Sequence, residues 1–341
     1  MPKKGRSSIS MQFAQDIVRA WNLPNMNSQK DVFEYLGKQT DSGTMSFYRS
    51  EAEEMTGVEL PAHNNKYNVI SRLERQNLPP LTNVVKVSDE TYTMVVFSDA
   101  HFEGYETPSY KILLKVMKDL TKTKELKCVI ANGDMLDLAI LSTFAKYTLD
   151  IEPKMRTVQQ EIDDSQQQLN NIQKIINQAK YPITQFATFG NHETRLSKFV
   201  SRWGTQFEDF KAFDMSFIFP HWTWGMSFVI DDTLIVKHSM RGGIHSTYHN
   251  AYRSGMNMVT GHTHQLNART WADYNGTTLA IATGHLSSPY HNYQHENVAN
   301  DWHNGFAVIT VDPRTRIISP ELIYVNNHHR CAYFRGKKYS V

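Results

Sequence analysis

This chain of 341 residues has little of several features that often decide a protein's class. It has two cysteines, Cys128 and Cys331, which are too few for a disulfide framework. No run of about 18 apolar residues is present, so we expect no membrane span. The first residues contain no apolar segment of the kind that a secretory signal needs. A formal net charge of +2 gives no overall acidic or basic signature. These absences predict a soluble, cytoplasmic protein with no membrane partner.

The pattern of the sequence changes near residue 90, which predicts a large domain with an appendage. Residues 1–90 show helical spacing over 10–21, 29–38, 45–55 and 67–76, as in a bundle of three or four helices. Helix-turn-helix readers of DNA have this size. The segment carries 11 basic and 11 acidic residues, however, rather than a basic excess. DNA binding by this bundle and a structural or partner-docking role therefore both stay open.

The sequence does have polar motifs that follow short apolar runs. The runs are typical of buried strands and cover residues 93–98, 127–132, 185–189, 233–237 and 257–260. The motifs, in chain order, are Asp99-Ala-His101, Gly133-Asp134-Met-Leu-Asp137, Gly190-Asn191-His192-Glu193, the single His238, and Gly261-His262-Thr-His264. Because α/β sheets usually place ligands at the carboxyl ends of their strands, we expect these side chains to converge on one rim.

The converging side chains would supply carboxylate, amide and imidazole donors, which suit two metal ions. The candidate ligands are Asp99, His101, Asp134, Asn191, His238, His262 and His264. Two divalent cations can share one bridging carboxylate and lower the pKa of a water between them, and the resulting hydroxide attacks phosphorus. A mixed nitrogen and oxygen site suits Mn²⁺, our first expectation, with Fe, Zn or Mg as alternatives.

The order of these motifs resembles the calcineurin-like metallophosphoesterase superfamily, over about residues 92–312. The resemblance implies a two-sheet αββα sandwich. It also implies that Asp99, His101 and His264 hold the first metal, that Asn191, His238 and His262 hold the second, and that Asp134 bridges them. His192 would not be a ligand and would assist at the leaving-group oxygen.

Two departures from related families narrow this interpretation. Purple acid phosphatases have a tyrosine where this chain has Asp137, so an iron–tyrosinate site is disfavoured. Ser/Thr protein phosphatases hold phosphate with arginines at the positions of Leu138 and Phe189, so a protein phosphatase is disfavoured as well. Arg195 and Arg241 lie near two motifs and could supply other phosphate contacts. A solvated or salt-bridged role is the alternative for both.

Two further residues near the motifs have open roles. Asp137 is expected to act beside the catalytic groups by orienting a ligand or a water, or to cap the following helix instead. His285 follows an apolar run at residues 278–283 and is expected to line the cleft as a substrate-binding residue.

A long amphipathic helix is expected over residues 154–180, covering the sheet or forming a homodimer contact. The chain would divide into a helical bundle at 1–90, a metallophosphoesterase domain at 91–325 and a basic, aromatic C-terminal tail at 326–341. Cations and rings alternate in this tail, as they do in many nucleic-acid contacts, and a solvated tail is the alternative.

The motifs and the appendages together predict a metal-dependent phosphodiesterase or nuclease that hydrolyses DNA or RNA. A phage or mobile-element origin would suit the helical appendage. One alternative is a phosphomonoesterase or a small cyclic-nucleotide phosphodiesterase with the bundle as a lid. Another is a non-catalytic protein that binds DNA or a partner and keeps a structural metal site. Fold resemblance alone does not decide among these substrates.

Overall fold

The computed structural model describes residues 9–21, 29–38, 41–58, 60, 82–142, 156–203, 211–274, 276–288 and 301–341. The chain divides into two compact units, Met1–Asn77 and Leu78–Val341. This division falls earlier than the expected change near residue 90, because the strand β1 (Thr82–Val85) pairs with a strand of the second unit. No described helix is long and apolar enough to cross a membrane.

Three helices form the first unit, close to the ranges that the sequence predicts. They are α1 (Met11–Trp21), α2 (Gln29–Tyr35) and α3 (Ser42–Thr56). Ile17, Trp21 and Phe33 are almost fully buried in their shared core. The helix expected at 67–76 lies outside the described residues. Whether this unit binds DNA stays a prediction.

Two six-stranded sheets form the second unit. The first has the order β1, β6 (Ser227–Ile230), β7 (Leu234–Lys237), β8 (Asn257–Thr260), β10 (Gly276–Thr283) and β9 (Leu266–Asp273). The second has the order β12 (Ile317–Tyr324), β11 (Gly305–Asp312), β2 (Tyr92–Phe97), β3 (Leu126–Asn132), β4 (Thr184–Thr188) and β5 (Thr223–Gly225). The pairs β2–β3, β3–β4 and β7–β8 are parallel, so their carboxyl ends open on common edges.

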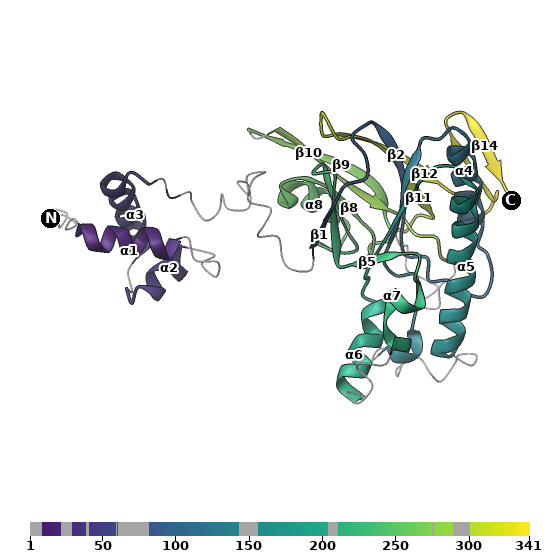
Figure 1. Cartoon of the computed structure of the whole chain (residues 1–341), viewed down its shortest axis with the longest axis horizontal. Coiled ribbons are helices and arrows are strands. Elements are labelled where there is room, and N and C mark those ends of the chain that lie inside the picture. Colours follow the sequence, from purple (N-terminus) through teal and green to yellow (C-terminus); the bar gives the residue numbers. More distant parts are fainter. Residues whose placement is uncertain are drawn as a thin grey trace. The chain divides into compact units, whose positions relative to one another are not determined.

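The alternation of side chains along β2 shows how the layers stack. Met94 and Val96 point into a core shared with the first sheet, whereas Val95 and Phe97 point into a core shared with helices. Those helices are α4 (Pro108–Lys122) and α5 (Val158–Gln178). The outer side of the first sheet packs against α8 (Ser246–Ser254). The expected αββα sandwich is therefore confirmed (Figure 1).

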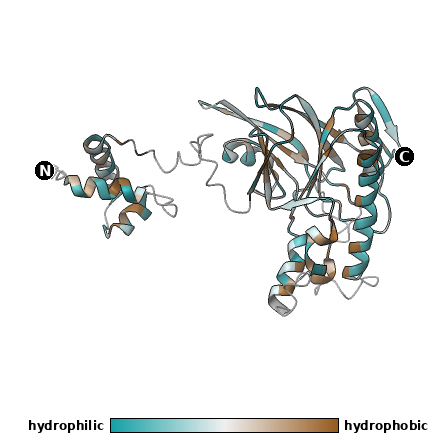
Figure 2. Ribbon diagram, in the orientation of Figure 1, coloured by the Kyte–Doolittle hydropathy of each residue, from teal (hydrophilic) through white to brown (hydrophobic). Residues whose placement is uncertain are grey.

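Amphipathic spacing predicts a helix over residues 154–180, and α5 occupies most of this range. Residues 154–155 lie outside the described part. A capping box of Thr157 and Gln160 begins it, which satisfies two backbone N–H groups. Leu169 and Ile172 are buried toward the sheet. Figure 2 shows its hydrophilic residues interrupted by hydrophobic ones, as covering a sheet requires. The dimer contact stays a prediction.

The last residues form a hairpin of β13 (Cys331–Phe334) and β14 (Lys337–Ser340) rather than a tail. The hairpin buries Phe334 and Tyr339 in the core that contains α4. Its cations meet acidic partners, because Arg335 contacts Glu321 at 2.8 Å. Folding thus pairs Arg335 and Lys337 with carboxylates and buries two of the rings, while the nucleic-acid contact that composition suggests stays a prediction. Shorter helices complete the unit: α6 (Glu193–Trp203), α7 (Met215–Ile218) and turns of 3₁₀ helix at Ala139–Leu141 and Lys211–Phe213.

Candidate metal centre

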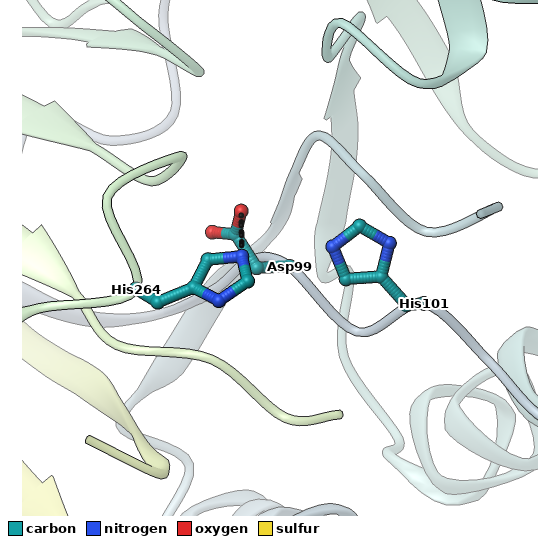
Figure 3. A group of neighbouring side chains, drawn as sticks. All are labelled: Asp99, His101 and His264. Carbon is teal, nitrogen blue, oxygen red and sulfur yellow. Dashed lines mark ion pairs between the residues drawn. The ribbon is translucent and has the colours of Figure 1, made fainter. Parts of the chain in front are cut away.

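The expected ligands gather where the carboxyl ends of strands from both sheets meet. Besides a third group of His101, Asp137 and His192, two clusters of three have ligand atoms within 4.8 Å of one another. We call them the Asp99 cluster (Asp99, His101 and His264, Figure 3) and the Asp134 cluster (Asp134, His238 and His262). The loops after β2 and β8 supply the Asp99 cluster, and those after β3, β7 and β8 supply the Asp134 cluster.

The Asp99 cluster is held from several sides. Nε2 of His264 lies 3.2 Å from Oδ1 of Asp99. The backbone N–H of His262 donates to Oδ2 of Asp99 at 2.9 Å, and the Ser98 hydroxyl also donates to this carboxylate. Burial opposes the charge of Asp99, but the imidazoles of His264, His238 and His101 outweigh it and lower its pKa well below the usual range.

In the Asp134 cluster, hydrogen bonding fixes which His238 nitrogen faces the ligands. Nδ1 lies 2.7 Å from the carbonyl oxygen of Asn132, and a carbonyl only accepts, so Nδ1 donates. Nε2 then faces Oδ2 of Asp134 at 3.0 Å and Oδ1 of Asn191 at 3.3 Å. Burial opposes a charge on His238, but the carboxylates of Asp134 and Asp99 outweigh it and raise its pKa to about 10.

This arrangement fits a metal ion. The lone pair on Nε2 of His238 faces oxygens of Asp134 and Asn191. Such an arrangement needs a proton or a cation between the nitrogen and the oxygens. In the Asp99 cluster, Nδ1 of His264 is buried without a hydrogen-bond partner among the described residues. Carboxylate, amide and imidazole donors together suit divalent transition metals. Two ions therefore fit, one at each cluster, and the bridging role expected for Asp134 stays a prediction.

The backbone at this edge is strained where the ligands project. Positive φ angles occur at residues that favour negative ones, and five of them are candidate ligands: Asp99, His101, Asp134, His262 and His264. Gly190 allows a close approach, because a Cβ at this position would lie 2.0 Å from Oδ1 of Asp134. The motif glycine thus leaves room for the carboxylate.

Glu193 is a positioning residue to which the sequence assigns no role. Its buried carboxylate accepts from the backbone N–H groups of Asp134 at 2.9 Å, Met135 at 2.6 Å and Gly190 at 2.8 Å. It therefore ties the loops after β3 and β4 together. Burial, and then the charge of Asp134, raises the pKa of Glu193. Its place at the end of the Gly-Asn-His-Glu motif was the available signal.

His192, Asp137 and Arg195 lie together beside the two clusters. Nδ1 of His192 is 2.7 Å from the carbonyl oxygen of Asp137 and 3.0 Å from its Oδ1. Nη2 of Arg195 is 3.1 Å from Nε2 of His192. A guanidinium only donates, so Nε2 accepts and His192 is neutral in this arrangement. Leu138, not Asp137, precedes the next 3₁₀ turn and makes no side-chain cap, which favours the orienting role for Asp137.

The structure separates the two expected substrate-binding residues. Arg241 is exposed, and among the described residues no ion pair or hydrogen bond joins it to the clusters. His285 is buried, with Nδ1 2.7 Å from the Ser287 hydroxyl, and its ring stacks on His264 at 5.0 Å. It backs a ligand rather than lining an open cleft. Trp302, which the sequence did not single out, lies 4.2 Å from the His264 ring.

Among the comparisons with known proteins, a family model matches the part of the chain that carries these motifs. The model of the family described as calcineurin-like phosphoesterase matches residues 92–311. A search of curated proteins finds no match. Among solved structures, an uncharacterized protein of Streptococcus pneumoniae TIGR4, described as a predicted phosphoesterase, is 13% identical with a TM-score of 0.29 and covers 74% of this chain and 100% of its own. A purple acid phosphatase from yellow lupin (Lupinus luteus) seeds is 12% identical with a TM-score of 0.34 and covers 73% of this chain and 54% of its own.

Proposed function

Because the chain belongs to the calcineurin-like phosphoesterase family, we propose that this metal-dependent phosphoesterase is a phosphodiesterase that cuts nucleic acid. The proposal rests on the single cation beside His192. Arg195 is the one lysine or arginine that the described residues place in hydrogen-bond contact with the site histidines. A phosphodiester carries one negative charge and a monoester carries up to two. One guanidinium therefore suits a diester.

The surroundings of the site support this choice over a protein phosphatase. Leu138 and Phe189 stand where protein phosphatases have phosphate-binding arginines. Leu138 is fully buried, and the ring of Phe189 packs 5.2 Å from that of Trp224. Neither position offers a cation to a phosphate, so a doubly charged phosphate would have fewer partners here.

The residues of the chain divide the chemistry between the metal centre and the leaving-group side. When bound, two divalent cations lower the pKa of a water and offset charge on the phosphoryl group. Asp137 fixes the Nδ1 proton of His192, so that Nε2 faces the leaving oxygen. Nε2 carries no proton while it accepts from Arg195, so it must first take one up from water and then pass it to that oxygen as the bond to phosphorus breaks. A substrate that reaches Nε2 displaces Nη2 of Arg195, which can then donate to a phosphoryl oxygen.

The test is to incubate the purified chain with Mn²⁺ and four substrates in parallel. These are bis-p-nitrophenyl phosphate, p-nitrophenyl phosphate, labelled single-stranded DNA and labelled duplex DNA. We expect metal-dependent cleavage of the diester and of DNA, with little turnover of the monoester. Arg195→Ala should reduce kcat/KM for the diester by roughly 10–100-fold, because a hydrogen bond to a charged group is lost.

Asp134→Asn controls for a contaminating nuclease, since it keeps the shape of a candidate ligand and removes its charge. Turnover of the monoester with no cutting of any nucleic acid would overturn the proposal and favour a phosphatase with the N-terminal unit as a lid. Labelled RNA serves as a further arm, which distinguishes the two polymers.

A further inference from the structure

The helix α8 and the strand β9 carry aromatic rings that contact one another at the surface. Tyr248 and Tyr252 lie one turn apart on α8, and their side chains are 43% and 50% exposed. Both rings meet Trp271 of β9 edge to face, at centroid distances of 5.8 Å and 4.8 Å. Trp271 is half-buried, whereas the two tyrosines are exposed beside it, and adjoining exposed rings of this kind indicate a contact surface.

Two arginines, Arg253 and Arg269, lie beside these rings, and no acidic residue in the described part of the chain forms an ion pair with either. Arg269 lies two residues before Trp271 on β9, which puts both on the same face of the strand. The guanidinium of Arg253 lies 5.9 Å from the Tyr252 ring centroid. Arg253, Arg269 and Arg241 are exposed, and within the described ranges none forms an ion pair. A pocket of about 460 Å³ includes Arg269 and is also lined by His245, Tyr248, Ala268 and Thr270.

Acidic residues are sparse in the sequence around this surface, and the exposed Asp273, two residues after Trp271 on β9, is the first one after Asp232. Residues 233–272 have no aspartate or glutamate, although the whole chain has 34. The same stretch contains His238, His262 and His264, so it is continuous in sequence with the metal centre. The Ser246 hydroxyl donates to Oε1 of Gln265 at 3.2 Å, which ties the start of α8 to the residue after His264.

The C-terminal hairpin shows that composition alone does not make such a surface. It also alternates rings and cations, but Arg335 contacts Glu125 and Glu321, and Lys337 contacts Asp119. A polyanion would have to displace these carboxylates, whereas on α8 and β9 the cations have no such competitor among the described residues.

We propose that the α8–β9 face (Tyr248, Tyr252, Arg253, Arg269 and Trp271) binds single-stranded nucleic acid and leads it to the metal centre. Exposed rings accept unstacked bases, and neighbouring arginines contact the phosphates. A duplex keeps its bases stacked inside, so it cannot offer them to the tyrosines. This inference rests on the proposed function, because it names the form of nucleic acid that reaches the same site.

Binding is measured by fluorescence anisotropy on the full chain carrying Asp134→Asn, which prevents cutting. The probes are labelled 15-nucleotide dT and rU strands and a mixed-sequence duplex. In this background, Tyr248→Ala with Tyr252→Ala should raise the Kd for single strands by roughly 10–100-fold, and Phe at both positions should retain binding because the rings remain. Arg269→Glu should weaken binding and lower the salt slope by about 1.

Matched controls lie on other parts of the same unit. Tyr333→Ala removes an exposed tyrosine from the hairpin, and Lys118→Glu reverses an exposed charge on α4. Neither should change the Kd. In the chain with an intact metal centre, the double tyrosine variant should hydrolyse bis-p-nitrophenyl phosphate normally while cutting single strands with a kcat/KM reduced by the same factor as binding.

Unchanged binding in the double tyrosine variant, or tighter binding of the duplex than of single strands, would overturn the inference. Equal loss of diester hydrolysis in that variant would overturn it too, since the rings would then support the fold. If the unaltered chain cuts neither diester nor oligonucleotide, the proposed function fails, and anisotropy still decides whether the face binds single strands.

Discussion

In the Asp99 cluster all three side chains are buried, whereas the Asp134 cluster includes His262, whose side chain is exposed. The Asp99 cluster is also backed by the rings of His285 and Trp302, which pack against His264. The two clusters share a donor chemistry and differ in their access to water. We infer that a metal in the Asp99 cluster exchanges slowly, and that one in the Asp134 cluster is the ion more accessible to substrate.

Asp134→Asn should reduce activity more than any other change. It should also weaken metal binding at both clusters, so that the two no longer differ in how they hold a metal. The charge of Asp134 acts on His238, His192 and His101, so its loss reaches both sides. We expect kcat for the diester to fall by about 10³-fold or more, because several kcal/mol of electrostatic stabilisation depend on the centre. Metal content by mass spectrometry should fall as well. Asp163→Asn, at an exposed position on α5, is the matched control and should leave both unchanged.

Comparing His238→Ala with His262→Ala sharpens the contrast within the Asp134 cluster. His238 is 1% exposed, and its removal leaves Oδ2 of the buried Asp134 without the imidazole that it faces at 3.0 Å. In metal-free protein, His238→Ala should lower the free energy of unfolding by about 3–5 kcal/mol. His262→Ala should change it by about 0.5 kcal/mol or less, although it too weakens one metal site. Urea unfolding checks both values, and equal losses would contradict the assigned difference in burial.

Metal binding and metal-free stability should respond oppositely to pH in the Asp134 cluster. The metal must displace the His238 proton, so affinity should rise about tenfold per pH unit below the metal-free pKa of about 10. Without metal, the raised pKa stabilises the fold fully below the unfolded value of about 6.5. That stability is lost as pH rises toward 10. Titration calorimetry and urea unfolding in chelator at pH 6, 8 and 10 test the two trends, and the metal-free trend should weaken in His238→Ala.

His285→Ala should have the smallest effect on metal binding. It should let the metal in the Asp99 cluster exchange faster, as we expect for the Asp134 cluster. Removing the ring that stacks on His264 leaves the ligands in place and loosens one of them. We expect a loss of about tenfold in metal affinity and faster exchange of the more tightly held ion, as for other outer residues of metal sites. Phe at this position should restore part of the stacking. Exchange rates that match those of the unaltered chain would argue against a backing role.

The amino-acid sequence by itself determined the strands and the ligand types. Buried strands are recognisable in the sequence as short apolar runs, and the motif residues follow these runs directly. Residues such as Asp99 and His238 could therefore be identified as candidate ligands without coordinates. Glycines of the motifs were visible too. Gly190 is required because the Asp134 carboxylate fills the space of a Cβ. Local pattern was sufficient wherever the chemistry lies within a few residues of a strand end.

Only the tertiary structure decided which charges are paired and which are free. The hairpin at the C-terminus and the α8–β9 surface both mix cations with rings. Arg335 meets Glu125, which is 210 residues away in sequence, whereas Arg269 meets no carboxylate among the described residues. The role of Glu193 likewise depends on a contact with the loop after β3, 59 residues earlier. Such pairings arise when folding brings distant segments together, and no local pattern of residues encodes them.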